Sequence, residues 1–141
     1  MTFDILPRLA NLPTWQISQA SARAHKLLHE RLAEAGSSGY EYRILAVLGD
    51  LGLASQADLG RAAALDRRDV THTVRGLEAR KLVSRSADPS DARQTLVELT
   101  NVGNSLLQRL DRVVDEVQND VLAPLTTTEG HTLLHLLRRL S

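Results

Sequence analysis

The sequence contains no cysteine, and only 3% of its 141 residues are aromatic. The absence of cysteine excludes disulfide bonds, thiolate zinc sites and thiol-based redox sensing. No stretch approaches the roughly 18 consecutive apolar residues of a transmembrane helix, and the first residues lack the basic and apolar pattern of a secretion signal. We therefore expect a cytoplasmic protein without a membrane partner, whose core consists of Leu, Val, Ile and Ala.

Motifs of catalysis and cofactor binding are also missing. The chain has no G-x-G-x-x-G turn, no P-loop and no H-E-x-x-H pair. It has no nucleophile motif, and its histidines fall in helical segments away from Ser–Gly turns. The sequence thus predicts neither an enzyme nor a bound cofactor.

Charge is balanced over the whole chain but not along it. The formal net charge is zero, yet residues 67–93 carry seven basic and four acidic side chains. Residues 1–66 carry six basic and seven acidic side chains, and residues 94–141 carry four and six. A local basic surface attracts phosphates even on a neutral molecule, so the central segment is the candidate for nucleic-acid binding.

Hydrophobic spacing divides the chain into helices and one β-hairpin. Apolar residues recur every three or four positions in the segments at about 14–35, 40–50, 55–65, 66–81, 100–122 and 127–140. Near alternation and β-branched residues predict strands at 82–85 and 94–99, joined by the long turn SADPSDAR. The fold class is therefore mostly α with a small β-hairpin wing: a winged helix-turn-helix plus a helical dimerisation lobe.

Polar side chains at the start of several helices mark their first residues. Ser55, Asp66 and Thr100 are expected to cap helices, and Thr126 with Glu129 has the spacing of a capping box. Two inward faces are also predicted. The helix after Ser55 is expected to bury Ala62 and Ala63 together with Ala57 or Leu59, and the helix at 100–122 is expected to bury a stripe that begins at Val102.

The helix that starts after Asp66 has a basic outer face. Its inner seam is Val70, Val74 and Leu77. At 100° per residue, a polar set points away from this seam: Arg67, Arg68, Thr71, His72 and Arg75. Such side chains read base edges and phosphates in the major groove, although on an isolated helix they would more often be a solvated surface. Their position on the second helix of a helix-turn-helix favours DNA.

The hairpin supplies a second candidate contact. Arg93 lies at its tip, where an extended guanidinium can enter the narrow minor groove, and Asp91 can orient it. We assign Asp88 to shaping the turn. The alternative for Arg93 and Asp91 is an ordinary surface ion pair worth about 0–1 kcal/mol.

From Ser55 to Gly103 the sequence resembles the MarR family of bacterial regulators. The resemblance rests on L-x5-L-D-x3-V-T-x2-V-x2-L from Leu59 to Leu77, on D-P-x-D-x-R from Asp88 to Arg93, and on L-T-x-x-G from Leu99 to Gly103. One position departs from the family, whose members commonly have glycine where Lys81 stands. A left-handed cap there would cost a non-glycine residue about 1 kcal/mol, which leaves a different helix end open.

The resemblance implies a homodimer that binds a palindromic operator in double-stranded DNA, most simply a repressor relieved by a small ligand. Residues 1–36 would form an N-terminal arm and dimerisation helix, 37–99 the winged DNA-binding lobe, and 100–141 the C-terminal dimerisation helices. Arg93 would be the wing-tip arginine and Asp91 its partner. The full set expected to contact DNA is Ser55, Gln56, Arg67, Arg68, Thr71, His72, Arg75, Arg85, Asp91 and Arg93.

Two-fold symmetry also follows from the apolar stripes of the first and last helices, which the small winged lobe is not large enough to cover. The implied effector is a small aromatic or lipophilic molecule, for which Trp15, Tyr42 and Arg43 are the candidate contacts, although Trp15 is equally suited to packing.

Two alternatives remain open. One is a winged-helix module for protein–protein contact. The other is a metal-responsive regulator, because the histidines occur in two pairs with i, i+4 spacing: His25 with His29 and His131 with His135. The same pairs also suit a pH sensor.

Overall fold

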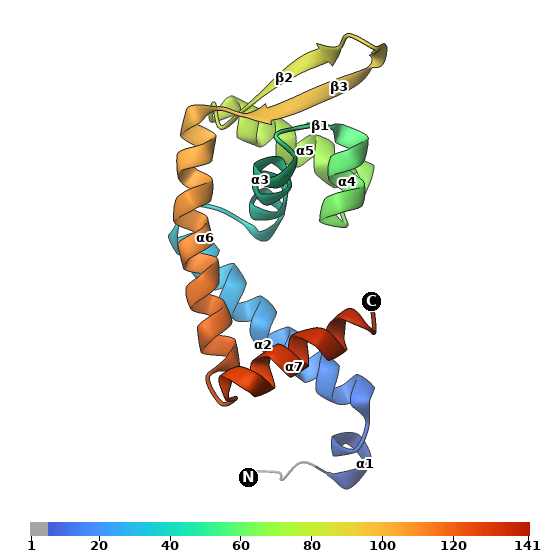
Figure 1. Ribbon diagram of the computed structural model, residues 1–141, viewed down its shortest axis with the longest axis vertical. Coiled ribbons are helices and arrows are strands. Elements are labelled where there is room, and N and C mark those ends of the chain that lie inside the picture. The colour runs from blue at the N-terminus through green and yellow to red at the C-terminus, as the bar shows by residue number, and fades with distance from the viewer. Residues whose placement is uncertain (1–5) are drawn as a thin grey trace. The chain divides into compact units, whose positions relative to one another are not determined.

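The computed structural model describes residues 6–141, which form a mainly helical protein with one three-stranded antiparallel sheet (Figure 1). The helices are α1 (Pro7–Ala10), α2 (Pro13–Glu34), α3 (Gly39–Leu51), α4 (Gln56–Ala63), α5 (Arg67–Ala79), α6 (Asn101–Leu122) and α7 (Thr127–Arg138). The strands are β1 (Leu53–Ser55), β2 (Val83–Asp88) and β3 (Asp91–Leu99). No helix in the described part combines the length and apolarity needed to cross a membrane.

The chain divides into two compact units. One, the winged lobe, comprises Leu32–Val113, and the other, the terminal unit, combines the described residues up to Arg31 with Val114–Ser141. The first half of α6 thus belongs to the winged lobe by its contacts. The assignment of residues 1–36 and 100–141 to dimerisation remains a prediction.

Helices α4, α5, α6 and α7 start where the capping side chains were predicted, whereas α3 starts after Ser38, a cap that was not predicted. The Ser55 hydroxyl accepts a hydrogen bond from the backbone N–H of Asp58 at 3.1 Å, and the Asp66 carboxylate accepts one from the N–H of Asp69 at 2.8 Å. Thr126 begins α7 with a complete capping box. Each cap satisfies an N–H that the first helical turn leaves without a partner, so local chemistry alone sets these boundaries.

The core of the winged lobe follows the predicted seam of α5. Val70, Val74 and Leu77 are buried, as is Leu59 of α4. Of the alternatives Ala57 and Leu59, it is Leu59 that faces inward, and Ala63 is buried as expected, whereas Ala57 is exposed. Two residues expected to face inward do not: Ala62 is exposed, and Val102 is 60% exposed. Alanine and valine bury less apolar area than leucine and so gain less free energy from facing inward, and single exposed apolar residues are normal on a folded surface.

The sheet contains a strand that hydrophobic spacing did not predict. Strand β1 pairs antiparallel with β3, with Ser55 opposite Leu96, and the strand order is β1-β3-β2. The hairpin itself is longer than expected, since Asp88 already pairs with Asp91 and only two residues turn between the strands. The polar stretch predicted as a long loop is therefore mostly strand. Its residues project beyond the core, so they carry no alternating hydrophobic signal.

The structure shows how α5 ends at Lys81, the position at which the resemblance to the MarR family led us to expect glycine. This residue adopts φ 61°, the left-handed conformation that favours glycine. The N–H of Lys81 donates to the carbonyl of Glu78, and that of Leu82 donates to the carbonyl of Leu77, both at 2.9 Å. This pattern is a Schellman motif. The helix thus ends in the usual way although lysine carries the strain.

Candidate nucleic-acid interface

The basic outer face predicted for α5 exists as one surface. Its five side chains line a single depression: Arg67, Arg68, Thr71, His72 and Arg75. Within residues 6–141, the three arginines of this set form no salt bridge. The Thr71 hydroxyl donates back to the carbonyl of Arg67 at 2.9 Å. The unpaired guanidinium groups are therefore available to an anionic partner.

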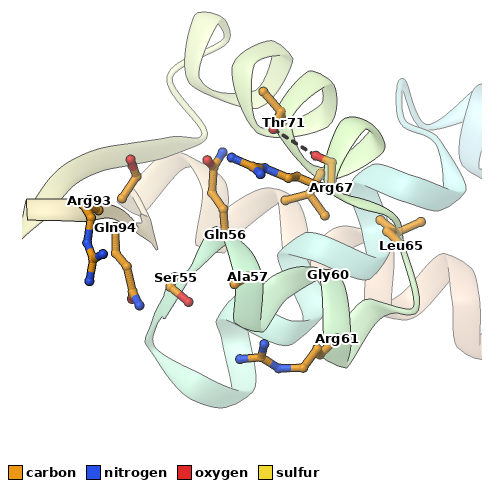
Figure 2. Close-up of a pocket in the computed structure, with 12 residues that line it drawn as sticks. Ser55, Gln56, Ala57, Gly60, Arg61, Leu65, Arg67, Thr71, Arg93 and Gln94 are labelled. Carbon is orange, nitrogen blue, oxygen red and sulfur yellow. Dashed lines mark hydrogen bonds between the residues drawn. The ribbon is translucent and has the colours of Figure 1, made fainter. Parts of the chain in front are cut away.

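A deeper groove of about 610 Å³ lies beside this face. Figure 2 shows that Arg67 reaches from α5 towards Gln56 at the start of α4, while Arg93 and Gln94 enter from β3. The remaining lining residues are mostly small or polar: Ser55, Ala57, Gly60, Arg61, Leu65, Val70, Thr71 and Thr95. Arg61 on α4 and the β3 residues Gln94 and Thr95 were not predicted as part of the site. Gln94 and Thr95 lie beside the start of α4 because β1, which leads into α4, pairs with β3, a long-range contact without a sequence signal.

Ser55 and Gln56 have different environments within this groove. Ser55 is only 5% exposed and its hydroxyl caps α4, so its side chain has a structural use. The Gln56 side-chain nitrogen is buried and has no hydrogen-bond partner in the described structure. A direct DNA contact by Ser55 or Gln56 remains a prediction.

The wing holds the predicted pair of Asp91 and Arg93. The Asp91 carboxylate accepts from the backbone N–H of Arg93 at 3.0 Å and from its side-chain Nε at 3.1 Å. The side-chain hydrogen bond from Arg93, together with the backbone one, holds the pKa of Asp91 below its ordinary value. The Arg93 side chain is still 91% exposed. The pair therefore presents an oriented guanidinium to solvent, on strand β3 next to the turn.

Arg85, also expected to contact DNA, has a partner that the sequence did not indicate. Its Nε lies 3.0 Å from Oε2 of Glu78, and its Nη2 lies 2.9 Å from Oε1. This hydrogen bond lowers the pKa of the Glu78 carboxyl and raises the pKa of the Arg85 guanidinium. The two residues are seven positions apart across a helix–strand boundary, a spacing that predicts no contact.

The three candidate ligand contacts are distributed over both units. Tyr42, on α3, donates a 2.8 Å hydrogen bond to the carboxylate of Asp111 on α6. The Arg43 guanidinium lies 5.7 Å from the centre of the Tyr40 ring. Trp15 is half-buried on α2, which belongs to the terminal unit. A ligand site that combines Trp15, Tyr42 and Arg43 stays a prediction.

The histidine pairs do not assemble into a four-histidine centre within one chain. His25 and His29 stack with ring centres 6.4 Å apart and an interplanar angle of 16°. However, residues 6–141 contain no group of three or more His, Cys, Asp or Glu side chains that is able to hold a metal ion. Within the described residues of one chain, the pair His25 and His29 therefore does not form a shared metal site with His131 and His135.

Comparison with known proteins agrees with this geometry. A sequence model of the MarR family matches residues 40–95. The repressor NicR of Pseudomonas putida is 28% identical over 138 residues, which cover 98% of this chain and 85% of NicR. YdgJ, an HTH-type transcriptional regulator of Bacillus subtilis, is 30% identical over 105 residues, 74% of this chain and 64% of YdgJ, so the chain spans less than two thirds of that relative.

Solved structures extend the similarity to nearly the whole chain. A probable transcriptional regulator from Pseudomonas aeruginosa has a TM-score of 0.85 and 33% identity, over 94% of this chain and 99% of that one. BpsR of Bordetella bronchiseptica, whose DNA binding is regulated by 6-hydroxynicotinic acid, has a TM-score of 0.82 and 26% identity, over 89% and 95% of the two chains. The chain therefore belongs to the MarR family and is a transcriptional regulator.

Proposed function

We propose that this regulator is a homodimeric repressor that binds a palindromic operator and releases it when a small aromatic acid binds. The observation that carries the proposal is the unpaired basic face of α5 with the exposed Arg93 beside it. In this arrangement α5 enters the major groove and the wing tip enters the adjacent minor groove. NicR is named as a repressor, which supports the same role here.

The exposed leucines of α7 support the dimer. Four leucines of α7 and one just beyond its end are solvent-accessible in the single chain, from 37% at Leu133 to 71% at Leu140: Leu133, Leu134, Leu136, Leu137 and Leu140. An apolar helix face of this size is normally covered by a partner. A two-fold dimer with its recognition helices about 34–36 Å apart matches two half-sites one DNA turn apart.

The proposed effector is an aromatic carboxylic acid. This class is favoured because 6-hydroxynicotinic acid is the regulator of the relative BpsR. In this chain Trp15 and Tyr42 offer aromatic surfaces and Arg43 offers a charge for a carboxylate. The effect is measured by titrating such acids into a protein–operator complex.

Protein–protein recognition is a less suitable use of the same surface. Protein interfaces place aromatic and apolar anchors at their centre, whereas the outer face of α5 holds three arginines, a histidine and a threonine. A phosphate backbone is the natural partner of such a set.

Gel-shift binding to the intergenic DNA upstream of the gene, measured across salt concentrations, tests the proposal. Phosphate contacts release counterions, so six to ten of them reduce affinity by about 10³–10⁵ between 50 and 200 mM salt. We expect this steep dependence and a two-fold symmetric footprint. Failure to bind any upstream fragment more tightly than random DNA would contradict operator recognition, and a stable monomer would contradict the dimer.

A further inference from the structure

Each of the two arginines of the wing is paired with a carboxylate, but only Arg85 is paired with a residue outside the wing. Its planar guanidinium contacts both oxygens of one carboxylate, that of Glu78 in the last turn of α5: Nε donates a hydrogen bond to Oε2, and Nη2 forms an ion pair with Oε1. Two contacts between the same two planar groups, unlike a single contact, define an orientation. The pair therefore connects the wing to the helix that carries the basic face.

The strand register explains why the two side chains meet. Arg85 lies opposite Val97 in the β2–β3 ladder, and Val97 is fully buried. Val83, two positions before Arg85, is buried as well. Because side chains alternate along a strand, Arg85 continues the inward face of β2 just beyond the core, where α5 contacts β2. The pair thus replaces hydrophobic packing at the point where the wing leaves the lobe.

Electrostatics disfavour a movement of the Arg85 side chain from Glu78 to a DNA phosphate. Glu78 is the one acidic residue of α5 beyond its first turn, since Asp69 stands at the helix start. Moving the guanidinium to a phosphate would expose an uncompensated carboxylate to the DNA backbone. Arg93 behaves differently, because its partner Asp91 leaves it 91% exposed, whereas the side chain of Arg85 is 34% exposed.

We propose that Arg85 is a positioning residue that, through Glu78, sets the placement of the wing relative to α5, and that it is not a phosphate ligand. The inference rests on the proposed operator binding. In this proposal, the pair of Glu78 and Arg85 fixes the distance between α5, which enters the major groove, and Arg93, which enters the minor groove. Loss of either partner is then expected to impair operator recognition more than binding to random DNA.

The variant Glu78→Gln separates the two roles because it removes a negative charge near DNA. If Arg85 were a phosphate ligand, releasing it from Glu78 would tighten binding to all DNA. A positioning role predicts the reverse for the operator, a weakening of about three- to tenfold that corresponds to the loss of a well-oriented surface pair. Tighter operator binding by Glu78→Gln would overturn the proposal.

Arg85→Gln and the charge-reversed double variant complete the test. With a positioning role, Arg85→Gln leaves the slope of log K against log salt unchanged, and Glu78→Arg combined with Arg85→Glu recovers most of the operator affinity. If Arg85 contacted a phosphate, Arg85→Gln would lose that contact and reduce the magnitude of the slope by about 0.9. The double variant would then not recover the operator affinity. Either of these two results would overturn the proposal.

Hydrogen exchange of the β2 and β3 amides provides a readout without DNA. Both single variants should exchange faster at the wing, and the charge-reversed double variant should exchange at the wild-type rate. Unchanged exchange in both single variants would contradict the positioning role. Absence of operator binding by the wild type would contradict the proposed function, while the exchange rates still decide whether the pair holds the wing.

Discussion

The hydroxyl of Thr100 donates a 2.7 Å hydrogen bond to the carbonyl oxygen of Lys81. The same oxygen of Thr100 accepts a 3.0 Å hydrogen bond from the backbone N–H of Gly103, so it caps α6 while it holds the end of α5. The L-T-x-x-G motif is thus a junction between the end of α5 and the start of α6.

Replacement of Gly103 should disrupt this junction. A β-carbon on Gly103 would lie 1.9 Å from the carbonyl oxygen of Leu82, a backbone atom that is not free to move aside. We expect Gly103→Ala to lower the free energy of unfolding by about 1–3 kcal/mol, the range for overpacking. Gly76→Ala is the matched control, since its β-carbon meets nothing within 4 Å in the interior of α5. Denaturant unfolding should show that this control is more stable by about 0.5–1 kcal/mol.

Lys81 should be a site where glycine stabilises the protein. Because Lys81 has φ 61°, Lys81→Gly relieves left-handed strain and should raise the free energy of unfolding by about 1 kcal/mol. Lys81→Ala removes the same charge but keeps the strain, so it should bring no gain. Equal midpoints for the glycine and alanine variants in urea would show that the strain is not significant.

Arg93 and Arg75 should contribute differently to operator binding. We expect Arg93→Ala to weaken association by about 1–3 kcal/mol without unfolding the protein, and Arg75→Ala in addition to relax the base preference. Lys26→Ala is the control, an exposed basic residue on α2 in the terminal unit. Quantitative gel shifts on the operator and on single-base variants provide the measurement. Wild-type affinity in both arginine variants would remove α5 and the wing from the interface.

The Asp91 carboxyl should titrate at a lower pH than an ordinary aspartate. Arg93 lowers its pKa in the folded protein from an ordinary value near 3.8. The pair therefore contributes its stability fully above that ordinary value and loses it as the pH falls through the lowered one. NMR titration of the carboxyl carbon should show the Asp91 pKa returning towards its ordinary value in Arg93→Ala. An identical titration curve in wild type and variant would refute the coupling.

The leucine face of α7 should be essential for dimerisation. Leu136 is 47% exposed in the single chain, so Leu136→Glu should leave the monomer folded but prevent association. Operator affinity should fall with it, because one recognition helix binds only one half-site. The control is His135→Glu, which introduces the same carboxylate. At about 100° per residue, His135 lies nearly opposite the centre of the leucine face. Sedimentation should find this control dimeric, and a dimeric Leu136→Glu would exclude this face from the interface.

Much of the candidate site could be predicted because its determinants are local. The basic face of α5 follows from helical periodicity within 13 residues, and the Asp91–Arg93 pair spans only two positions. The MarR-like motifs carried the same information. What the sequence did not reveal was Glu78 as the partner of Arg85, and Gln94 and Thr95 as lining residues of the groove.

The sequence alone determined where α4, α5, α6 and α7 begin and which side of α5 faces outward. Capping bonds and helical seams join residues three or four positions apart, so their chemistry is readable from the order of residues. Only the tertiary structure decided that Leu53–Ser55 forms a strand beside β3, that the strands of the wing run to a two-residue turn with a register shift between Ala87 and Asp88, and that Arg85 faces Glu78. These contacts depend on strand register, which is set by the packed core as a whole, because residues distant in sequence meet only once the chain has folded.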